Sequence, residues 1–173
     1  NFNPSDFADG VLDSDQYEFI ELQNVGRIPL DLSGMKFTDG VEFDFTGGNV
    51  TSLDPGQYVL VVRNEAAFKA RYPNVAVDLI AGEFVDSKLS NKGEQLAMVD
   101  ALQQTVFDFS YNDNWYDITD GDGFTLSRRD DADTFADLEL KRAWRPSSEL
   151  LGSPGAADPQ TQPEPGAIVI NEI

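Results

Sequence analysis

The last seven residues constrain the fold more than any other stretch of the chain. Ala167–Ile173 is rich in β-branched apolar residues, which favour an extended strand that needs neighbours to pair with. Residues 156–166 precede it and have the proline-, glycine- and polar-rich composition of a linker. No turn or partner strand follows. We therefore expect this strand to pair with a segment much earlier in the chain or with another molecule.

Hydrophobic periodicity predicts that the rest of the chain is built from short β-strands. Val41, Phe43 and Phe45 alternate with acidic residues, and residues 105–111 alternate in the same way, as half-buried strands do. Residues 57–63 and 94–99 are apolar on both faces, which predicts central strands. Further strands are expected at residues 17–22, 35–38, 125–128 and 138–142.

Turn residues separate these strands, and one short helix interrupts them. Glycine combined with asparagine or aspartate occurs between the apolar runs, as in Asp54-Pro-Gly56, which is typical of a β-sandwich or barrel. Residues 64–72 have helical composition, with Asn64 as a predicted N-cap and Pro73 as the terminator. The fold class expected is all-β with one short helix.

Charge and residue usage exclude several functions. The chain holds 31 acidic and 12 basic residues, a formal net charge of −19, which repels phosphate backbones and anionic membranes. We therefore expect no nucleic-acid partner and no membrane insertion. Cysteine and histidine are both absent, so disulfides, thiolate zinc sites and nucleophilic triads built on histidine are impossible within this sequence. We predict that the chain is not an enzyme.

A series of short motifs resembles one family along nearly the whole chain. The residues that carry the resemblance are Glu18-Phe-Ile-Glu-Leu-Gln-Asn24, Asp31-Leu-Ser-Gly34, residues 53–62, residues 68–72, residues 89–96, Asp120-Gly-Asp-Gly-Phe-Thr-Leu126, Trp144-Arg-Pro146 and Gly152-Ser-Pro-Gly155. In this order they are similar to the lamin tail domain, which occurs in nuclear lamins and in bacterial extracellular or envelope proteins. The resemblance implies an immunoglobulin-like β-sandwich. The lamins' nuclear functions are not implied, because the chain lacks their rod, basic tail and prenylation signal.

The same resemblance gives the last strand an identity. The family's domain opens with a strand resembling Val-Ile-Asn-Glu-Ile, whereas this chain opens at Asn1-Phe-Asn-Pro4 and ends with that strand. We therefore expect a sandwich over residues 1–155, a linker over 156–166, and a strand over 167–173 that replaces the missing first strand. This arrangement predicts a tandem array of such domains. The residues expected to close the sandwich are Ile168, Val169, Ile170 and Ile173, either in their own chain, giving a monomer, or in a neighbour, giving a strand-swapped oligomer.

Two acidic loops are candidate calcium sites. Asp9, Asp13 and Asp15 share an N-terminal loop, and Asp120 and Asp122 share a glycine-rich one. Calcium takes six to eight oxygen ligands, largely from carboxylates on such loops. The alternative for the second loop is a structural turn, because it lacks EF-hand spacing and its glycines suit positive φ. The cofactor expectation is therefore none, with calcium as the exception.

Aromatic residues and paired carboxylates offer further alternatives. Trp115, Tyr116 and Trp144 form either a ligand platform or anchors of the core and loops. Glu18 and Glu21 lie three apart on a strand, and therefore on opposite faces, which does not suit glycoside hydrolysis.

The expected function is a non-catalytic spacer, adhesion or protein-binding module. It would belong to a larger, tandem-repeat, exported or surface bacterial protein, with an extracellular or cell-surface location. Two alternatives remain open, a calcium-stabilised binding domain and an accessory domain of a larger extracellular hydrolase or nuclease. The partner, whether a protein or a surface polymer, does not follow from the residues.

Overall fold

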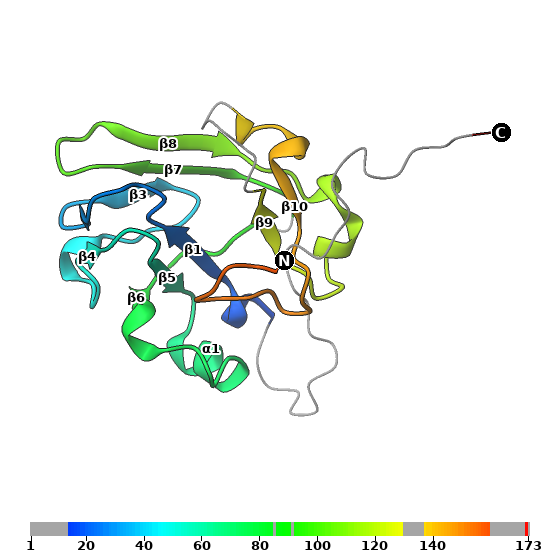
Figure 1. Cartoon of the computed structure of the whole chain (residues 1–173), viewed down its shortest axis with the longest axis horizontal. Helices are drawn as coiled ribbons and strands as arrows, with labels where there is room; N and C mark the ends of the chain where they lie inside the picture. The colour runs from blue at the N-terminus through cyan, green and yellow to red at the C-terminus, as the bar shows by residue number, and fades with distance from the viewer. Residues whose placement is uncertain (1–13, 85, 91, 130–136, 160–171, 173) are drawn as a thin grey trace.

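Two three-stranded sheets packed face to face form the body of the molecule. A computed structural model describes residues 14–84, 86–90, 92–129, 137–159 and 172. One sheet has the order β1-β5-β6, formed by β1 (Phe19–Gln23), β5 (Tyr58–Val62) and β6 (Ile80–Glu83). The other has the order β3-β7-β8, formed by β3 (Lys36–Asp39), β7 (Gln95–Val99) and β8 (Thr105–Ser110). Figure 1 shows the second sheet lying above the first. The architecture is an immunoglobulin-like β-sandwich.

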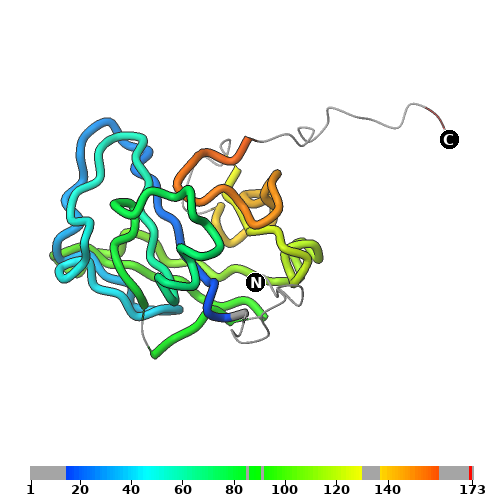
Figure 2. The backbone as a smooth tube through the Cα atoms, turned by 90° about the horizontal axis from the view of Figure 1, so that it is seen from below, coloured from blue at the N-terminus to red at the C-terminus, as the bar shows by residue number. Residues whose placement is uncertain are grey.

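Smaller elements complete the sandwich. β2 (Leu30–Asp31) pairs with β4 (Ser52–Leu53), and β9 (Leu126–Arg128) pairs with β10 (Trp144–Pro146). In Figure 2 the chain after β8 and the last described stretch gather at one end of the molecule. The described residues also form short 3₁₀ turns, which are η1 (Ser14–Tyr17), η2 (Phe45–Gly47), η3 (Val77–Leu79), η4 (Asp113–Trp115), η5 (Asp117–Thr119) and η7 (Lys141–Ala143).

The central strand β5 buries both of its faces, as its sequence predicted. Val59 and Val61 belong to the core between the two sheets, together with Phe37, Phe45, Phe84 and Met98. Leu60 and Val62 point the other way and pack against the helix α1 (Glu65–Arg71) through Phe68. Because β6 runs parallel to β5, the chain needs a crossover connection, and α1 supplies it. The predicted N-cap is confirmed, since the Asn64 side chain accepts a hydrogen bond from the Ala67 amide.

Two of the predicted strands are wrong. Residues 41–45 do not form a strand; they contribute one isolated bridge between Lys36 and Asp44 and then enter η2. The Asp44 carboxylate accepts a hydrogen bond from the Thr46 amide at 2.8 Å, which starts the turn at that point. Burial still alternates as predicted, with Val41 and Phe45 buried. Residues 138–142 form turns and the start of η7, and the strand begins only at Trp144.

Candidate functional site

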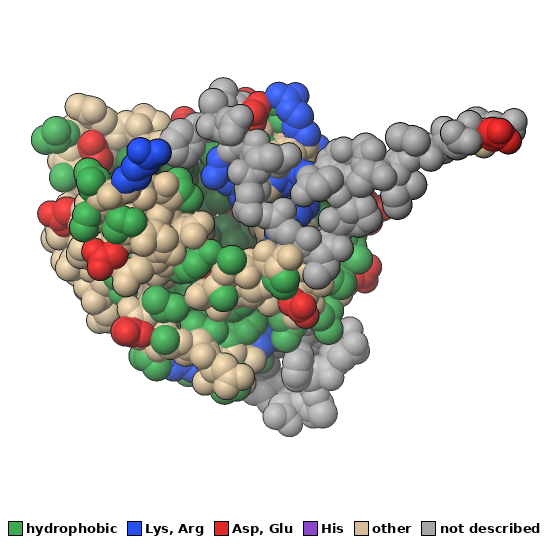
Figure 3. All heavy atoms as spheres, in the orientation of Figure 1, with side chains coloured by type: hydrophobic (Ala, Val, Ile, Leu, Met, Phe, Trp, Pro, Cys, Tyr) green, Lys and Arg blue, Asp and Glu red, His purple; other side chains and the backbone are tan. Residues whose placement is uncertain are grey.

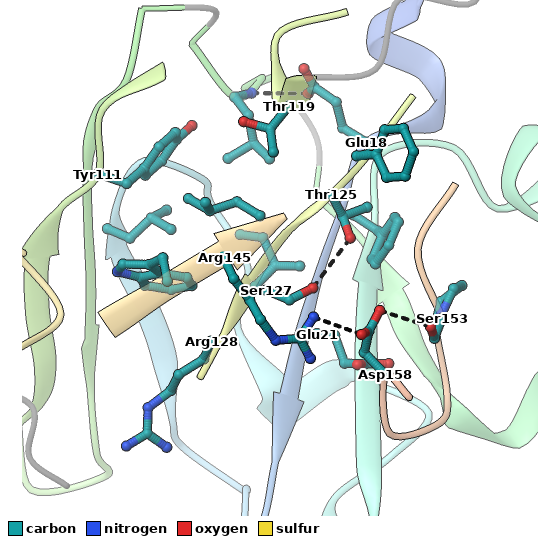
Figure 4. Close-up of a pocket in the computed structure, with 18 of the residues that line it drawn as sticks. Glu18, Glu21, Tyr111, Thr119, Thr125, Ser127, Arg128, Arg145, Ser153 and Asp158 are labelled. Carbon is teal, nitrogen blue, oxygen red and sulfur yellow. Dashed lines mark hydrogen bonds and ion pairs between the residues drawn. The ribbon is translucent and has the colours of Figure 1, made fainter. Parts of the chain in front are cut away.

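A cavity of about 980 Å³ opens into the sandwich between β1, β8 and the β9–β10 pair. Figure 3 shows it as a hollow near the middle of one face, with hydrophobic side chains recessed inside. Figure 4 shows the side chains that surround it, with Tyr111 on one side, Arg145 and Ser127 across the middle, and Glu18 and Glu21 on the β1 side. We call this cavity the strand gap, because it lies between the edges of the strands β1 and β9.

The first wall is β1, and the cavity borders both of its faces. Phe19, Ile20, Glu21 and Gln23 all line it. Successive residues of a strand point to opposite faces, so a cavity between two sheets would be lined by every second residue only. Ile20 packs in the core between the sheets, whereas Phe19 packs on the other face, edge-on to Phe68. The cavity therefore runs along the edge of β1, where a neighbouring strand would lie.

The main chain of β1 has hydrogen-bonding groups directed at this edge. β1 pairs with β5 alone among the described strands. Hydrogen bonds from the Arg63 amide to the Glu18 carbonyl and from the Asn24 amide to the Gln57 carbonyl fix the ladder. The even-numbered residues of β1 therefore bond to β5, and the N–H and C=O groups of Phe19, Glu21 and Gln23 point the other way.

The opposite wall is β9, and it has the same character. Consecutive residues from Leu126 to Arg129 line the cavity. The Arg129 amide donates to the Ala143 carbonyl, and the Ser147 amide donates to the Thr125 carbonyl, which places the odd-numbered residues on the β10 side. The main chain of Leu126 is then directed away from β10. β1 and β9 therefore border the same cavity, each along the edge that faces away from its partner strand.

The inner side of the strand gap is apolar. Leu96, Phe109 and Leu138 form a buried cluster there, and Phe107 and Trp144 pack against it. The Trp144 ring stacks on Phe109 at 5.5 Å between centroids, and its indole N–H donates to the Leu138 carbonyl at 2.8 Å. Aromatic side chains of this kind prefer an apolar neighbour over water. The gap therefore suits a segment with apolar side chains.

The outer side of the strand gap is mixed in character, because Leu151, Pro154 and Ala156 line it together with Ser153 and Asp158. The Arg145 guanidinium and the Asp158 carboxylate form an ion pair at 2.7 Å, with exposed side-chain fractions of 5% and 9%. The second oxygen of Asp158 accepts hydrogen bonds from the Ser148 amide and the Ser153 hydroxyl, the latter drawn in Figure 4. These contacts fix Asp158 at the rim of the gap.

Glu21 is the second anchor of this stretch. Its carboxylate accepts a hydrogen bond from the Gly155 amide. Gly155 has a φ of +83°, a conformation that glycine adopts without strain. Burial raises the pKa of Glu21 to about 7, and the hydrogen bond from Gly155 opposes the rise without cancelling it. Glu21 therefore takes up a proton near neutral pH.

Glu21 should make stability fall as the pH rises. A carboxyl whose pKa is about 7 when folded and near its ordinary value of 4.5 when unfolded favours the folded state most below pH 4.5. That contribution declines as the pH rises from 4.5 and is lost above 7. Unfolding by urea at a series of pH values from 4 to 8 should show the decline. Glu21→Gln should flatten this part of the profile, and an unchanged profile would contradict the assignment.

The calcium candidates are separated in the structure. The Asp15 carboxylate accepts a hydrogen bond from the Lys88 ammonium at 2.9 Å. Asp120 and Asp122 are exposed in the turn after η5, and Asp9 and Asp13 lie outside the described residues. Within the part of the chain that the structure describes, no three acidic groups come together in a way that could hold a metal ion. The calcium site stays a prediction.

The remaining predicted site residues have separate outcomes. Ile168, Val169, Ile170 and Ile173 lie outside the described residues, whereas Glu172 is described and is exposed. Trp115 and Trp144 stack on each other, and the Tyr116 hydroxyl donates to the Trp144 carbonyl, which supports an anchoring role, while Trp144 also lines the cavity. The sequence did not reveal the ion pair between Arg145 and Asp158 at the gap. No sequence motif links these two residues, which come together only in the folded chain.

Glu18 and Glu21 both border the gap but serve different backbone segments. The Glu18 carboxylate accepts from the Leu89 amide at 2.9 Å, and Glu21 accepts from Gly155. Figure 4 shows the two side chains well separated along the cavity. This arrangement supports a structural role for each carboxylate.

No helix among the described residues has the length and apolar character needed to cross a membrane.

Comparison with known proteins identifies the family. A family model described as Lamin Tail Domain matches residues 5–113, well over half of the chain. No match was found to a curated protein or to a solved structure. The family consists of non-catalytic, immunoglobulin-like interaction domains, which agrees with the sandwich described above. The fold and the matched residues together show that the chain belongs to the lamin tail domain family.

Proposed function

We propose that the chain is a protein-binding module that works by β-strand addition. An extended apolar segment of a protein enters the strand gap, pairs with β1 on one side and β9 on the other, and completes the sheet. In strand addition, main-chain hydrogen bonds supply affinity, and the alternating side chains of the added strand supply specificity. The module is non-catalytic and belongs to a larger, tandem-repeat, exported or cell-surface bacterial protein.

The observation that carries this proposal is the lining of β1. Phe19, Ile20, Glu21 and Gln23 border one cavity from both faces of the strand, and three of these residues direct main-chain groups into it. A strand rises about 3.3 Å per residue, so an occupant of five or six residues spans roughly 17–20 Å, the length of β1 itself. A globular small molecule would not satisfy a row of main-chain donors and acceptors.

Charge and composition support the remainder of the proposal. A net charge of −19 disfavours nucleic acid and anionic lipid, which favours a polypeptide as the partner. The absence of histidine and cysteine removes the commonest nucleophile and base pairs. Export and cell-surface location rest on analogy with bacterial members of the family and on the strong acidity, which favours solubility in salt.

A peptide titration tests strand addition. The probe is a synthetic peptide with the sequence of residues 167–173, labelled with a fluorophore. The protein is the full chain carrying Val169→Asp and Ile170→Asp, so that its own last strand cannot compete. We expect saturable binding by fluorescence anisotropy, because the gap of this variant is open. A peptide with aspartate at the two corresponding positions is the matched control and should bind at least tenfold more weakly.

A second variant locates the binding site. Leu126→Lys places a charge on β9 within the gap, and Leu102→Lys places the same charge on the β7–β8 turn, where Leu102 is 77% exposed and outside the cavity. Both are made in the double-aspartate chain. Peptide affinity should fall at least tenfold with the first and stay unchanged with the second. Absence of saturable binding, or equal effects of the two lysines, would refute strand addition at this gap.

A further inference from the structure

We infer that the strand gap selects a partner strand with a carboxamide side chain, asparagine or glutamine, on the face that lies toward the outer side of the gap. This inference rests on the proposed function and names the chemistry of the partner segment. Three observations carry it: the polar face of the β9–β10 pair, an unused edge of the Arg145 guanidinium, and two carboxylates that line the same side.

The β9–β10 pair presents a polar face to the outer side of the gap. Ser127 and Arg145 are directly opposite each other in this pair, so their side chains lie on the same face. Thr125 shares that face, and its hydroxyl lies 3.4 Å from the Ser127 hydroxyl (Figure 4). Trp144 points to the opposite face and stacks on Phe109 at the inner side. Because the faces of a sheet continue from strand to strand, the outward side chains of an added strand lie beside the polar groups.

The Arg145 guanidinium, which lines the gap, has one edge that makes no hydrogen bond. Both of its hydrogen bonds to described residues leave from Nη1, one to the Asp158 carboxylate at 2.7 Å and one to the Pro146 carbonyl at 3.1 Å. Nε, on the other edge, is buried and donates to none of the described residues. A buried donor without an acceptor is costly, and more so when it belongs to a charged group. This edge therefore favours an occupant that supplies a hydrogen-bond acceptor.

Two carboxylates decide which kind of acceptor fits. Glu21 accepts a hydrogen bond from Gly155, and Arg145 pairs with Asp158 three residues further on, so both carboxylates lie beside the same short stretch of chain. A third carboxylate would add like charge to a buried cluster in which Asp158 already neutralises Arg145. A lysine or arginine would bring no acceptor. A carboxamide carries an acceptor oxygen and two N–H donors without charge, so it can bond to Arg145 and also donate to Glu21 or the Ser127 hydroxyl.

Three labelled peptides test this inference in the double-aspartate chain that is used for the peptide titration. Each peptide has a core of alternating isoleucine and valine with lysines at both ends for solubility. Only the central residue differs, and it is asparagine, leucine (similar in shape to asparagine) or aspartate. By fluorescence anisotropy, we expect the asparagine peptide to bind at least tenfold more tightly than either of the others, because it alone pairs the buried donor without adding charge. Strand propensity and apolar burial alone would favour leucine over asparagine.

Arg145→Lys locates the source of the preference. Lysine keeps a positive charge beside Asp158 but has no Nε edge, so the preference for asparagine should disappear. The matched control is Arg142→Lys, in the exposed ion pair with Asp137 outside the cavity, which should leave the preference unchanged.

The outcomes separate this inference from the proposed function. Equal binding of the asparagine and leucine peptides, or a preference for asparagine that survives Arg145→Lys, would overturn the inference and leave strand addition standing. Aspartate binding as tightly as asparagine would overturn it as well. If none of the three peptides bound saturably, strand addition at the gap would be refuted, and the inference with it.

Discussion

Asp158→Asn should destabilise the protein by about 3–5 kcal/mol, the expected cost of breaking a buried ion pair by removing one partner. The pair with Arg145 has exposed fractions of only 5% and 9%. Asparagine preserves the shape of the side chain but leaves the Arg145 guanidinium charged in a poorly hydrated place. The free energy of unfolding in urea measures the loss.

The chain contains a natural control for this prediction. Arg142 and Asp137 form an ion pair with the same 2.7 Å separation, but their side chains are 72% and 30% exposed. Asp137→Asn should therefore cost no more than about 1 kcal/mol. Replacing the buried pair by Arg145→Met with Asp158→Leu should recover part of the loss, because no charge is then stranded. Equal losses from the two asparagine variants would contradict the burial assigned to Asp158.

Phe68→Ala should cost about 3–5 kcal/mol, the usual range for removing a buried aromatic side chain. Phe68 belongs to α1, and its side chain is fully buried on the side of the helix that faces the sheet. Its ring centroid lies 5.5 Å from that of Phe19 and 4.7 Å from that of Tyr72. The cavity left behind would loosen the helix from the outer face of β1 and β5. Ala70→Ser, on the exposed side of the same helix, should change stability by no more than about 0.5 kcal/mol. Denaturant unfolding of both variants checks the difference.

Sequence periodicity predicted the elements whose structure is determined by residues that are near one another in the sequence. β5 and β7 are central strands because their residues are apolar on both faces, and α1 begins at Asn64 because that side chain caps it. The pattern failed at residues 41–45, where burial alternates but Asp44 turns the chain into η2. It failed again at residues 138–142, where the Leu138 carbonyl bonds to the Trp144 indole and the chain turns. Alternating apolar residues indicate which side chains are buried. A strand forms only where the main chain also finds a neighbouring strand to bond to.

The sequence predicted only part of the candidate site. The apolar composition of residues 167–173 predicted a strand that needs a partner, but the edge with which such a strand would pair depends on contacts between distant residues. Glu21 meets Gly155, 134 residues further on, and Arg145 meets Asp158 across a loop. The motif Glu18-Phe-Ile-Glu21 shows carboxylates on both faces of a strand, which could have suggested that this strand borders a polar cleft. The cavity itself follows only from the three-dimensional arrangement of β1 and β9.

Hydrogen exchange along β1 tests most directly whether the gap holds a strand. The amides of Ile20 and Leu22 bond to β5 and should be protected in every case. In the full chain, the amides of Phe19 and Gln23 should be protected to a similar degree, because an added strand accepts their hydrogen bonds. Val169→Asp with Ile170→Asp should accelerate exchange at Phe19 and Gln23 at least tenfold and leave Ile20 and Leu22 unchanged. Rapid exchange at Phe19 and Gln23 in the unmodified chain, unaltered by the added peptide, would contradict strand addition at this edge.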